Sequence, residues 1–443
     1  MSDARARLAE LDVERCRAAI RAKNPGLAAI LRVFDEPLQT TKEGPLAGVP
    51  FVLKDVWDTP GIVTTGGSFR HRERVPSEPA HAFTALMKTG AVLLGKSNLC
   101  DLAFSPESDN HLFGPVRNPH DPSRTAGGST GGGAAAVAAG LAAFDWGTDF
   151  GGSIRSPAGF CGIVGLRLSN ATWPVEHHHF PRIAPFFWSF CGMGPLARSV
   201  GEARLVLEAV TELRRPDAPP VTMKQDEVVI YGPDAALRGE WPTFEADAAR
   251  LLDEAGVAHA PAALPPISAV NHLFGAYLCS HFDDFTNDDE LPVLEGLSAV
   301  LVGLASGGRF DKRVHPNTGV LLALVALGGH TIYRGSARWD DRVAALRAET
   351  EAIWGRGHLI VTPTCTRVTP RHGRAAFTRG IQAFTRFGNL TDSTGIAIPF
   401  GKFPGTNLPR SLQIAGPPGS EASVLDLAER LERTLEARRG QAS

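Results

Sequence analysis

Two short glycine-rich segments each place a serine directly after paired glycines, a pattern that favours nucleophilic chemistry. Ser129 follows glycines 127 and 128, and Ser153 follows glycines 151 and 152. Glycine reaches backbone conformations closed to other residues and lets a ligand approach main-chain N–H groups, which a developing oxyanion requires. Each segment taken alone also fits a flexible loop. The two together predict an acyl-transfer site.

A lysine ends an apolar segment that has the composition of a buried strand. Residues 48–53 are Gly-Val-Pro-Phe-Val-Leu, and Lys54 follows them. A serine hydroxyl is a weak nucleophile and needs a neighbouring base, and a lysine serves only when its amine is neutral. Burial disfavours the ammonium form and lowers the pKa. Lys54 is therefore a candidate functional residue, although a lysine at a strand end is often simply solvated.

The segments around these residues resemble the amidase signature family, hydrolases that use a Ser-Ser-Lys triad. The resemblance extends over roughly half of the chain, in the family's order, and fades between residues 264 and 357. Weaker similarity follows at residues 359–364 and 411–431. The main matching segments are GPLAGVPFVLKD from Gly44, GAVLLGKSNLCDLAFS from Gly90, GPVRNPHDPSRTAGGSTGG from Gly114, GTDFGGSIRSPAGFCGIVGLR from Gly147 and GMGPLARSV at 192–200.

The resemblance implies a role for each residue of the triad. Ser153 would be the nucleophile, Ser129 the bridging serine on a cis peptide bond, and Lys54 the terminal base. Thr130 stands where the family often has a second serine, which keeps a hydroxyl and leaves the bridging role with Ser129. The oxyanion hole would consist of main-chain N–H groups, those of Phe150, Gly151, Gly152 and Ser153.

The substrate pocket is indicated mainly by a departure from the family's pattern. The family commonly has Ser-x-Asp-x-x-Gly-Pro where this chain has residues 189–195, so that Cys191 replaces a carboxylate. Aromatic residues at 180 and 186–188 precede it, and if they line the pocket they favour an apolar or aromatic acyl or amine group. They fit the protein core equally well. The residues assigned to substrate binding are Phe104, Thr130, Phe187, Trp188 and Cys191.

The implied activity is hydrolysis of the C–N bond of a small-molecule amide through an acyl-enzyme, without a cofactor. An apolar or aromatic amide or a carbamate (urethane) is the preferred substrate. Two alternatives stay open: the glutaminase subunit of a tRNA-dependent amidotransferase, which requires partner chains, and an esterase or aryl acylamidase with the same triad. A catalytically inactive scaffold is disfavoured because all three triad positions are filled.

Two other motif matches are interpreted as coincidences. Gly127, Ser129 and Gly131 satisfy G-x-S-x-G, but that nucleophile elbow needs a strand immediately before it, and the proline-rich residues 117–124 are expected to form a loop. Residues 90–97 fit the phosphate-loop pattern G-x-x-x-x-G-K-S. Their interior, Ala-Val-Leu-Leu, is typical of a buried strand instead.

Composition excludes several classes of protein. The net charge of −2 and the pI near 6.7 offer no basic stripe for nucleic acid. The sequence has no apolar run of the roughly 18 residues that a membrane span needs, and no signal peptide is recognised, so a cytoplasmic monomer or homodimer is expected. The 6 cysteines lack a C-x-x-C spacing and fit reduced thiols. No metal is expected, because the consecutive His177–His179 cannot easily share one ion.

The pattern of short apolar strands alternating with helical segments predicts an α/β fold. The resemblance implies the amidase-signature fold, a mixed central β-sheet covered by helices on both faces. One domain is expected over residues 1–443, with a catalytic core at 44–200 and a helical cap, dimer face or plain core at 264–357. Helices are expected at 3–23 and 133–141. Strands are expected near 48–53, 91–95, 144–148, 163–167, 227–231, 358–362 and 395–399.

Overall fold

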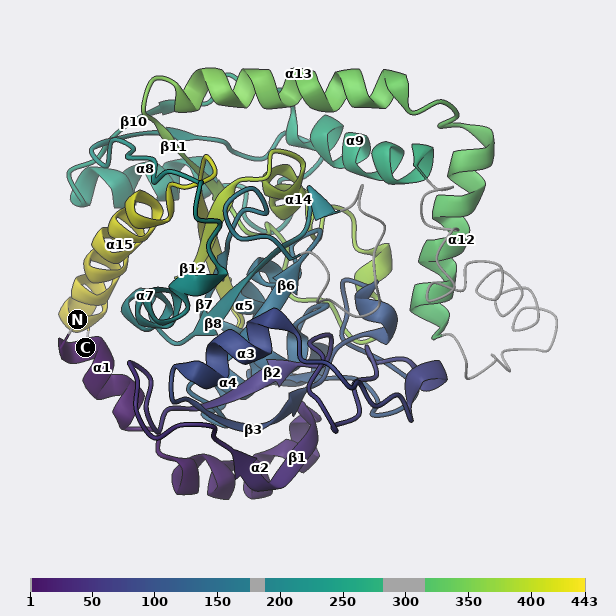
Figure 1. Cartoon of the computed structure of the whole chain (residues 1–443). Coiled ribbons are helices and arrows are strands. Elements are labelled where there is room, and N and C mark those ends of the chain that lie inside the picture. Colours follow the sequence, from purple (N-terminus) through teal and green to yellow (C-terminus); the bar gives the residue numbers. More distant parts are fainter. Residues whose placement is uncertain (1, 176–187, 282–314, 443) are drawn as a thin grey trace.

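The computed structural model describes residues 2–175, 188–281 and 315–442, and a mixed sheet forms its centre (Figure 1). The sheet has 11 strands in the order β1-β3-β2-β6-β8-β7-β12-β13-β11-β9-β10. A separate two-stranded sheet pairs β4 with β5. The strands are β1 (Ile30–Leu38), β2 (Pro50–Lys54), β3 (Val92–Ser97), β4 (Arg117–Asn118), β5 (Asp121–Thr125), β6 (Phe144–Asp149), β7 (Val164–Arg167), β8 (Gly192–Ala197), β9 (Glu227–Ile230), β10 (Ala258–Pro261), β11 (Leu359–Pro363), β12 (Thr394–Lys402) and β13 (Pro409–Gly416).

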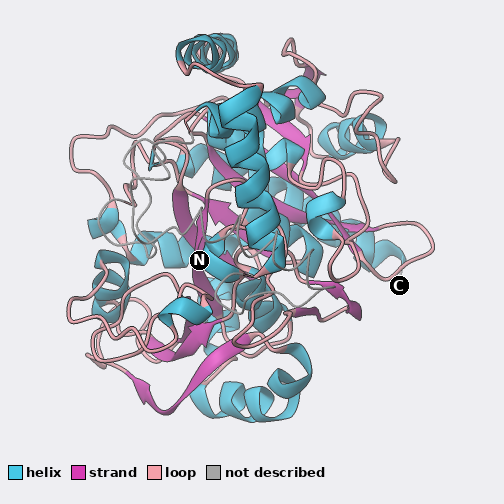
Figure 2. Cartoon of the chain, turned by 90° about the vertical axis from the view of Figure 1, so that its right-hand side faces the viewer, coloured by secondary structure: helices cyan, strands magenta, loops and turns pink. Residues whose placement is uncertain are grey.

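Helices cover both faces of the sheet, as expected (Figures 1 and 2). On one face, α4 packs on α5 and both contact the central strands. On the other face, α7 packs on α15 beside β8 and β12. The described helices are α1 (Ser2–Ala9), α2 (Val13–Leu27), α3 (His81–Lys88), α4 (Gly131–Ala138), α5 (Arg155–Cys161), α7 (Val200–Ala209), α8 (Phe244–Glu254), α9 (Ile267–Ser280), α12 (Pro316–Thr331), α13 (Ala337–Trp354), α14 (Ala383–Leu390) and α15 (Glu421–Ala442).

Three adjacent strands near the β1 edge of the sheet determine where the catalytic candidates lie. Strand β2 pairs in parallel with both β3 and β6, and every residue of the three strands is buried. Phe51 of β2 stacks on Phe144 of β6, with ring centroids 4.9 Å apart. Because parallel strands end at the same edge of a sheet, Lys54 at the end of β2 and Asp149 at the end of β6 meet there.

All seven expected strands are present, and so is the helix expected at 133–141, which is α4. The single helix expected at 3–23 was wrong, because α1 ends before Asp12, whose side chain accepts a hydrogen bond from Arg15 N at 2.7 Å and begins α2. The loop expected at 117–124 was also partly wrong, since it contains β4 and most of β5. Residues 92–97 form β3, which confirms the strand interpretation over a phosphate loop.

In the region from 264 to 357 the structure describes helices α9, α12 and α13. Helix α9 packs against α12, α13 and α14. Two apolar runs of the sequence fall in this region: residues 320–327 lie within α12, and residues 291–305 lie outside the described residues. Within the described parts of the chain, no helix combines the length and apolar character that a membrane crossing requires.

Candidate active site

Lys54 is fully buried, and among the described residues it hydrogen-bonds only to hydroxyl and carbonyl oxygens. Its Nζ donates to Ser129 Oγ at 2.7 Å and to Thr148 Oγ1 at 2.9 Å, with a longer contact to Thr148 O at 3.4 Å. Burial lowers the pKa of Lys54 to about 8, against smaller opposing effects that include nearby acids. With this pKa about a tenth of the amine is neutral at pH 7, far more than for an ordinary lysine.

The two serines reach the site from the starts of two packed helices. Ser129 precedes α4 and Ser153 precedes α5, and the main chain joins the two segments where Thr130 N donates to Ser153 O at 3.1 Å. The peptide bond between Gly128 and Ser129 is cis, as the resemblance implied. Ser129 is 1% exposed and Ser153 is 7% exposed, so the second serine is the one that opens toward solvent.

Two carboxyl groups lie near Lys54: one is paired with an arginine, and the other has a raised pKa. Asp149 accepts from Arg155 Nη2 at 2.8 Å and from Arg155 Nε at 3.0 Å, and this guanidinium holds the pKa of Asp149 well below its usual range despite burial. Asp145 accepts from Ser97 Oγ at 2.8 Å, and burial raises its pKa to about 7. Neither carboxylate forms an ion pair with Lys54 within the described residues, which keeps burial as the dominant influence on the amine.

The main-chain amides expected to form the oxyanion hole differ in availability. The N–H of Gly152 donates to Asp149 Oδ1 at 2.9 Å, so this amide is already engaged. Gly152 has a φ of +118°, and an added Cβ would collide with Thr385 Oγ1. In the described part of the chain, the N–H groups of Gly151 and Ser153 donate to no protein acceptor. The geometry thus leaves Gly151 and Ser153, and not Gly152, free to bind an oxyanion.

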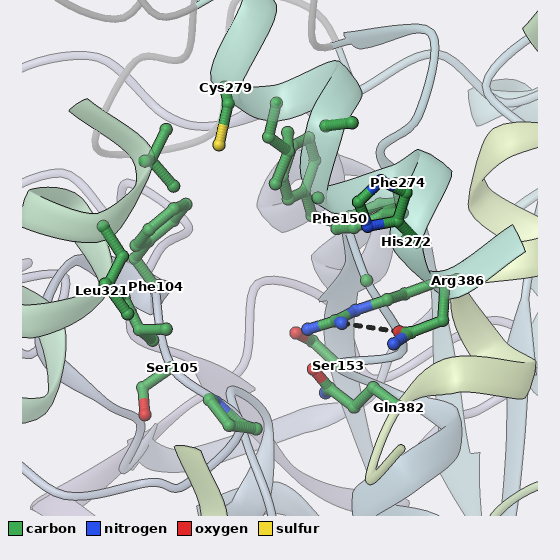
Figure 3. Close-up of a pocket in the computed structure, with 18 of the residues that line it drawn as sticks. Phe104, Ser105, Phe150, Ser153, His272, Phe274, Cys279, Leu321, Gln382 and Arg386 are labelled. Atoms are coloured by element: carbon green, nitrogen blue, oxygen red, sulfur yellow. Dashed lines mark hydrogen bonds between the residues drawn. The ribbon is translucent and has the colours of Figure 1, made fainter. Parts of the chain in front are cut away.

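A cavity of about 390 Å³ lies over Ser153 (Figure 3). Its wall is mainly apolar, with Arg386 and Gln382 on the side of Ser153, and Phe104 and Leu321 across from them. The described residues that line it are Ala103, Phe104, Ser105, Pro106, Phe150, Gly151, Ser153, Asn271, His272, Phe274, Gly275, Ala276, Leu278, Cys279, Leu321, Leu324, Val325, Tyr333, Gln382 and Arg386.

Of the four expected substrate-binding residues that the structure describes, one lies at this cavity. Phe104 lines it. Thr130 is fully buried and donates to Thr148 O at 3.3 Å, and Cys191 is 1% exposed within the core, with burial raising its thiol pKa to about 12. Trp188 is absent from the described lining of the cavity, and Phe187 lies outside the described residues.

Sequence reasoning missed most of the pocket wall. Phe274 comes from α9, Leu321 from α12 and Arg386 from α14, all far in the chain from the serines. The hydrogen bond from Gln382 Nε2 to Gly128 O, at 3.0 Å, connects this wall to the bridging-serine segment. The sequence signal for this wall was limited to the apolar run at 320–327. Side chains that meet across a cavity come from distant parts of the chain, so they leave no recognisable spacing in the sequence.

The described residues contain no cluster of three or more His, Cys, Asp or Glu side chains suited to a metal ion. His177–His179 lie outside the described residues. The six cysteines are all buried as free thiols. Lys54 hydrogen-bonds to Ser129 Oγ, and no histidine does so within the described residues. The nucleophile-elbow interpretation therefore lacks the histidine base that it requires.

Comparisons with known proteins identify the family of the chain. The family described as Amidase matches residues 7–239. The chain is 34% identical over 421 residues to "Putative amidase AmiB2" of Mycobacterium tuberculosis, covering 88% of this chain and 82% of the relative. It is 29% identical to a glutamyl-tRNA(Gln) amidotransferase component of Anaeromyxobacter sp., covering 96% of this chain and 88% of the relative.

A solved structure shares the fold over nearly the whole chain. The structure of 6-aminohexanoate cyclic dimer hydrolase complexed with substrate superimposes with a TM-score of 0.75 at 24% identity, covering 97% of this chain and 94% of that one. The family match and the 34% identical relative together carry the assignment. The chain belongs to the amidase family, and it is an amidase-signature hydrolase of amide C–N bonds.

Proposed function

We propose that the protein hydrolyses small-molecule amides through an acyl-enzyme on Ser153, with Ser129 as the bridging serine and Lys54 as the base. The observation that carries the proposal is the 2.7 Å hydrogen bond between Lys54 Nζ and Ser129 Oγ, made by a buried lysine without an ion-pair partner in the described residues. Such a lysine can supply a neutral amine, and in this proposal the hydroxyl of Ser129 carries the proton between Lys54 and Ser153.

Each step of the reaction has a group in place. Neutral Lys54 takes a proton from Ser129, which takes one from Ser153 as its Oγ attacks the carbonyl carbon. In this proposal the N–H groups of Gly151 and Ser153, together with that of Phe150, donate to the oxyanion of the tetrahedral intermediate. The same relay then returns a proton to the leaving nitrogen, the C–N bond breaks, and water hydrolyses the acyl-enzyme by the reverse relay.

The apolar cavity wall supports an apolar or aromatic substrate. Phe104, Phe274 and Leu321 bury apolar area in proportion to contact, which favours a hydrophobic acyl or amine group. A carbamate (urethane) passes through the same type of tetrahedral intermediate as an amide, so it is included in the proposed substrate class. An aryl anilide and an ester are the other carbonyl compounds that the relay would process.

A glutaminase component of a tRNA-dependent amidotransferase is the second candidate, because one of the relatives belongs to such an amidotransferase. This role requires partner chains that receive the ammonia. Purification of the protein from its native source distinguishes the two roles: stable partners and glutaminase activity support the amidotransferase role, whereas activity on amides by the protein alone supports the independent hydrolase.

The direct test uses a fluorophosphonate, which reacts with activated serines whatever the substrate. Intact mass and peptide mapping should find one adduct, on Ser153, in the wild type. The adduct should be absent from Ser153→Ala and form at least 100-fold more slowly in Lys54→Met, in keeping with a base that contributes about 10²- to 10⁴-fold. An adduct on Ser129, or none, would refute the assigned roles.

A further inference from the structure

We propose that Arg386 recognises a carboxylate on the substrate, so that the enzyme prefers amides with an apolar body and one anionic end. The inference rests on the proposed function, since it names the substrate class of the same site. Arg386 lines the cavity that contains Ser153, and Figure 3 shows both on the same side of it.

Within the described residues, the hydrogen-bond partner of the Arg386 guanidinium is a neutral side chain. Its Nη1 donates to Asn271 Oδ1 at 2.7 Å, and its guanidinium lies over the ring of Phe274, with 5.0 Å from Cζ to the ring centroid. Its Nε is enclosed by protein atoms without an acceptor. Among the described residues, no carboxylate forms an ion pair with Arg386. Burial lowers the pKa of Arg386 to about 10, so the guanidinium remains charged near pH 7.

Two fully buried arginines differ from Arg386, which is only partly buried at the cavity. Arg155 contacts Asp149 at 2.8 Å, and Arg167 contacts Asp392 at 3.0 Å. A cation removed from water without a counter-ion is costly, so proteins normally pair it. The exception is the arginine at the reaction cavity, and a ligand carboxylate supplies the missing partner.

The donors of Arg386 fit this ligand. Phe274 covers one face of the guanidinium and Asn271 fixes Nη1, which limits the orientations of the fork. Nη2 makes no hydrogen bond within the described residues and is not enclosed as Nε is, so it is open to the cavity. Nη2 and the second hydrogen of Nη1 together form a planar pair of donors, the geometry that binds a carboxylate through two oxygens.

The opposite wall of the cavity indicates the chemical character of the rest of the substrate. Phe104 and Leu321 present apolar surface there and contribute no charge. A molecule that contacts this wall, places its carbonyl at Ser153 and reaches Arg386 has an apolar chain or ring with a carboxylate at one end. Either the acyl part or the amine part of the amide carries that carboxylate.

The test compares matched substrates on the wild type. One series consists of 4-nitroanilides of succinic, glutaric and adipic acids, each beside its terminal carboxamide and its methyl-terminated analogue. A second series consists of butyramides of ω-amino acids beside the corresponding amino amides, with amine release measured by mass spectrometry. In at least one series the carboxylate should be preferred over the isosteric carboxamide by about 10- to 100-fold in kcat/KM.

Three variants test whether Arg386 causes the preference for a carboxylate. Arg386→Met should abolish it, Arg386→Lys should retain part of it, and Arg374→Gln, which removes an exposed arginine, should leave it unchanged. Arg374→Gln should react with the fluorophosphonate at Ser153 at the wild-type rate. The two Arg386 variants should still form the adduct on Ser153 and melt like the wild type, which shows that they are folded and that the nucleophile is intact.

The outcomes separate this inference from the proposed function. Normal labelling of Ser153 with no carboxylate preference in either series overturns the role of Arg386 and leaves the hydrolase assignment standing. A preference that survives in Arg386→Met also overturns it, as does equal use of carboxamide and carboxylate. Failure of Ser153 to react in the wild type refutes the proposed function itself.

Discussion

Lys54 and Lys96 are both fully buried and lie on adjacent, parallel strands of the sheet, but their surroundings differ. Lys96 forms an ion pair with Asp55 at 3.2 Å and donates to Trp57 O at 2.6 Å. Lys54 contacts hydroxyl and carbonyl oxygens and has no ion-pair partner among the described residues. Burial lowers the pKa of both amines, and Asp55 opposes this only for Lys96.

This difference in partners is consistent with Lys96 as a structural cation and Lys54 as the proposed base. A carboxylate in contact stabilises the ammonium form, whereas hydroxyl partners accept its hydrogen bonds without adding a full negative charge. The same contrast separates Arg155, paired with Asp149, from Arg386 at the cavity. In both pairs, the cation without a carboxylate is the one that lies at the reaction site.

The largest expected effect is on activity, from Lys54→Met. Loss of the base should lower kcat/KM by about 10²- to 10⁴-fold. Thermal stability should change little, because the variant removes a buried charge that has no ion-pair partner to leave behind among the described residues. Kinetics on the best amide substrate and a thermal melt of the same sample check this. A fall in melting temperature large enough to explain the lost activity would make Lys54 a structural residue like Lys96.

Lys96→Met should have the opposite profile. It leaves the buried Asp55 carboxylate without its cation, which should lower the free energy of unfolding by about 3 to 5 kcal/mol. Denaturant unfolding measures this change. The double variant Lys96→Met/Asp55→Asn should recover part of the loss, because the amide is neutral and still accepts from Thr65. No recovery would mean that the ion pair is not the source of the stability.

The pH dependence of the reaction should report the pKa of Lys54. The neutral amine is the active form and its pKa is lowered to about 8, so kcat/KM should rise as the pH rises through about 8 and level off above it. The same limb should appear in the rate of labelling by the fluorophosphonate. A rate that is constant from pH 6 to about 9, or that falls over this range, would contradict Lys54 as the base.

The smallest effect is expected from Thr148→Val, which removes the hydroxyl that accepts from Lys54 at 2.9 Å. That acceptor stabilises the ammonium form, so its loss should lower the pKa of Lys54. The rise of kcat/KM with pH should then shift to lower pH by less than about 1 unit. Thr148→Ser keeps the hydroxyl and should behave like the wild type. A shift to higher pH would show that another group dominates the electrostatics around the amine.

The sequence predicted the structure best where the information is local. The seven expected strands are apolar runs bounded by turn residues, and all seven formed. Strand β8 was not expected, because its sequence, GMGPLA, contains two glycines and a proline and lacks the usual strand composition. The break at Asp12 was missed because one capping side chain, and not the apolar periodicity, decides where α2 begins.

The residues of the candidate site show the same difference between local and non-local information. The motif resemblance indicated Lys54, Ser129 and Ser153. In the structure Lys54 hydrogen-bonds to Ser129, and Ser153 lines the cavity. The expected pocket residues Thr130 and Cys191 are instead buried away from it. Adjacency in the chain to a catalytic motif says little about which face of the backbone a side chain occupies.

The sequence alone determined the family, the strand pattern and the identity of the chemical groups, because these depend on residue types and short-range spacing. Only the tertiary structure decided which lysine lacks a carboxylate, which amides remain unengaged and which distant helices enclose the cavity. The physical reason is that pKa, hydrogen-bond occupancy and cavity shape depend on atoms within a few ångströms in space. Helices α9, α12 and α14 supply those atoms from positions far along the chain.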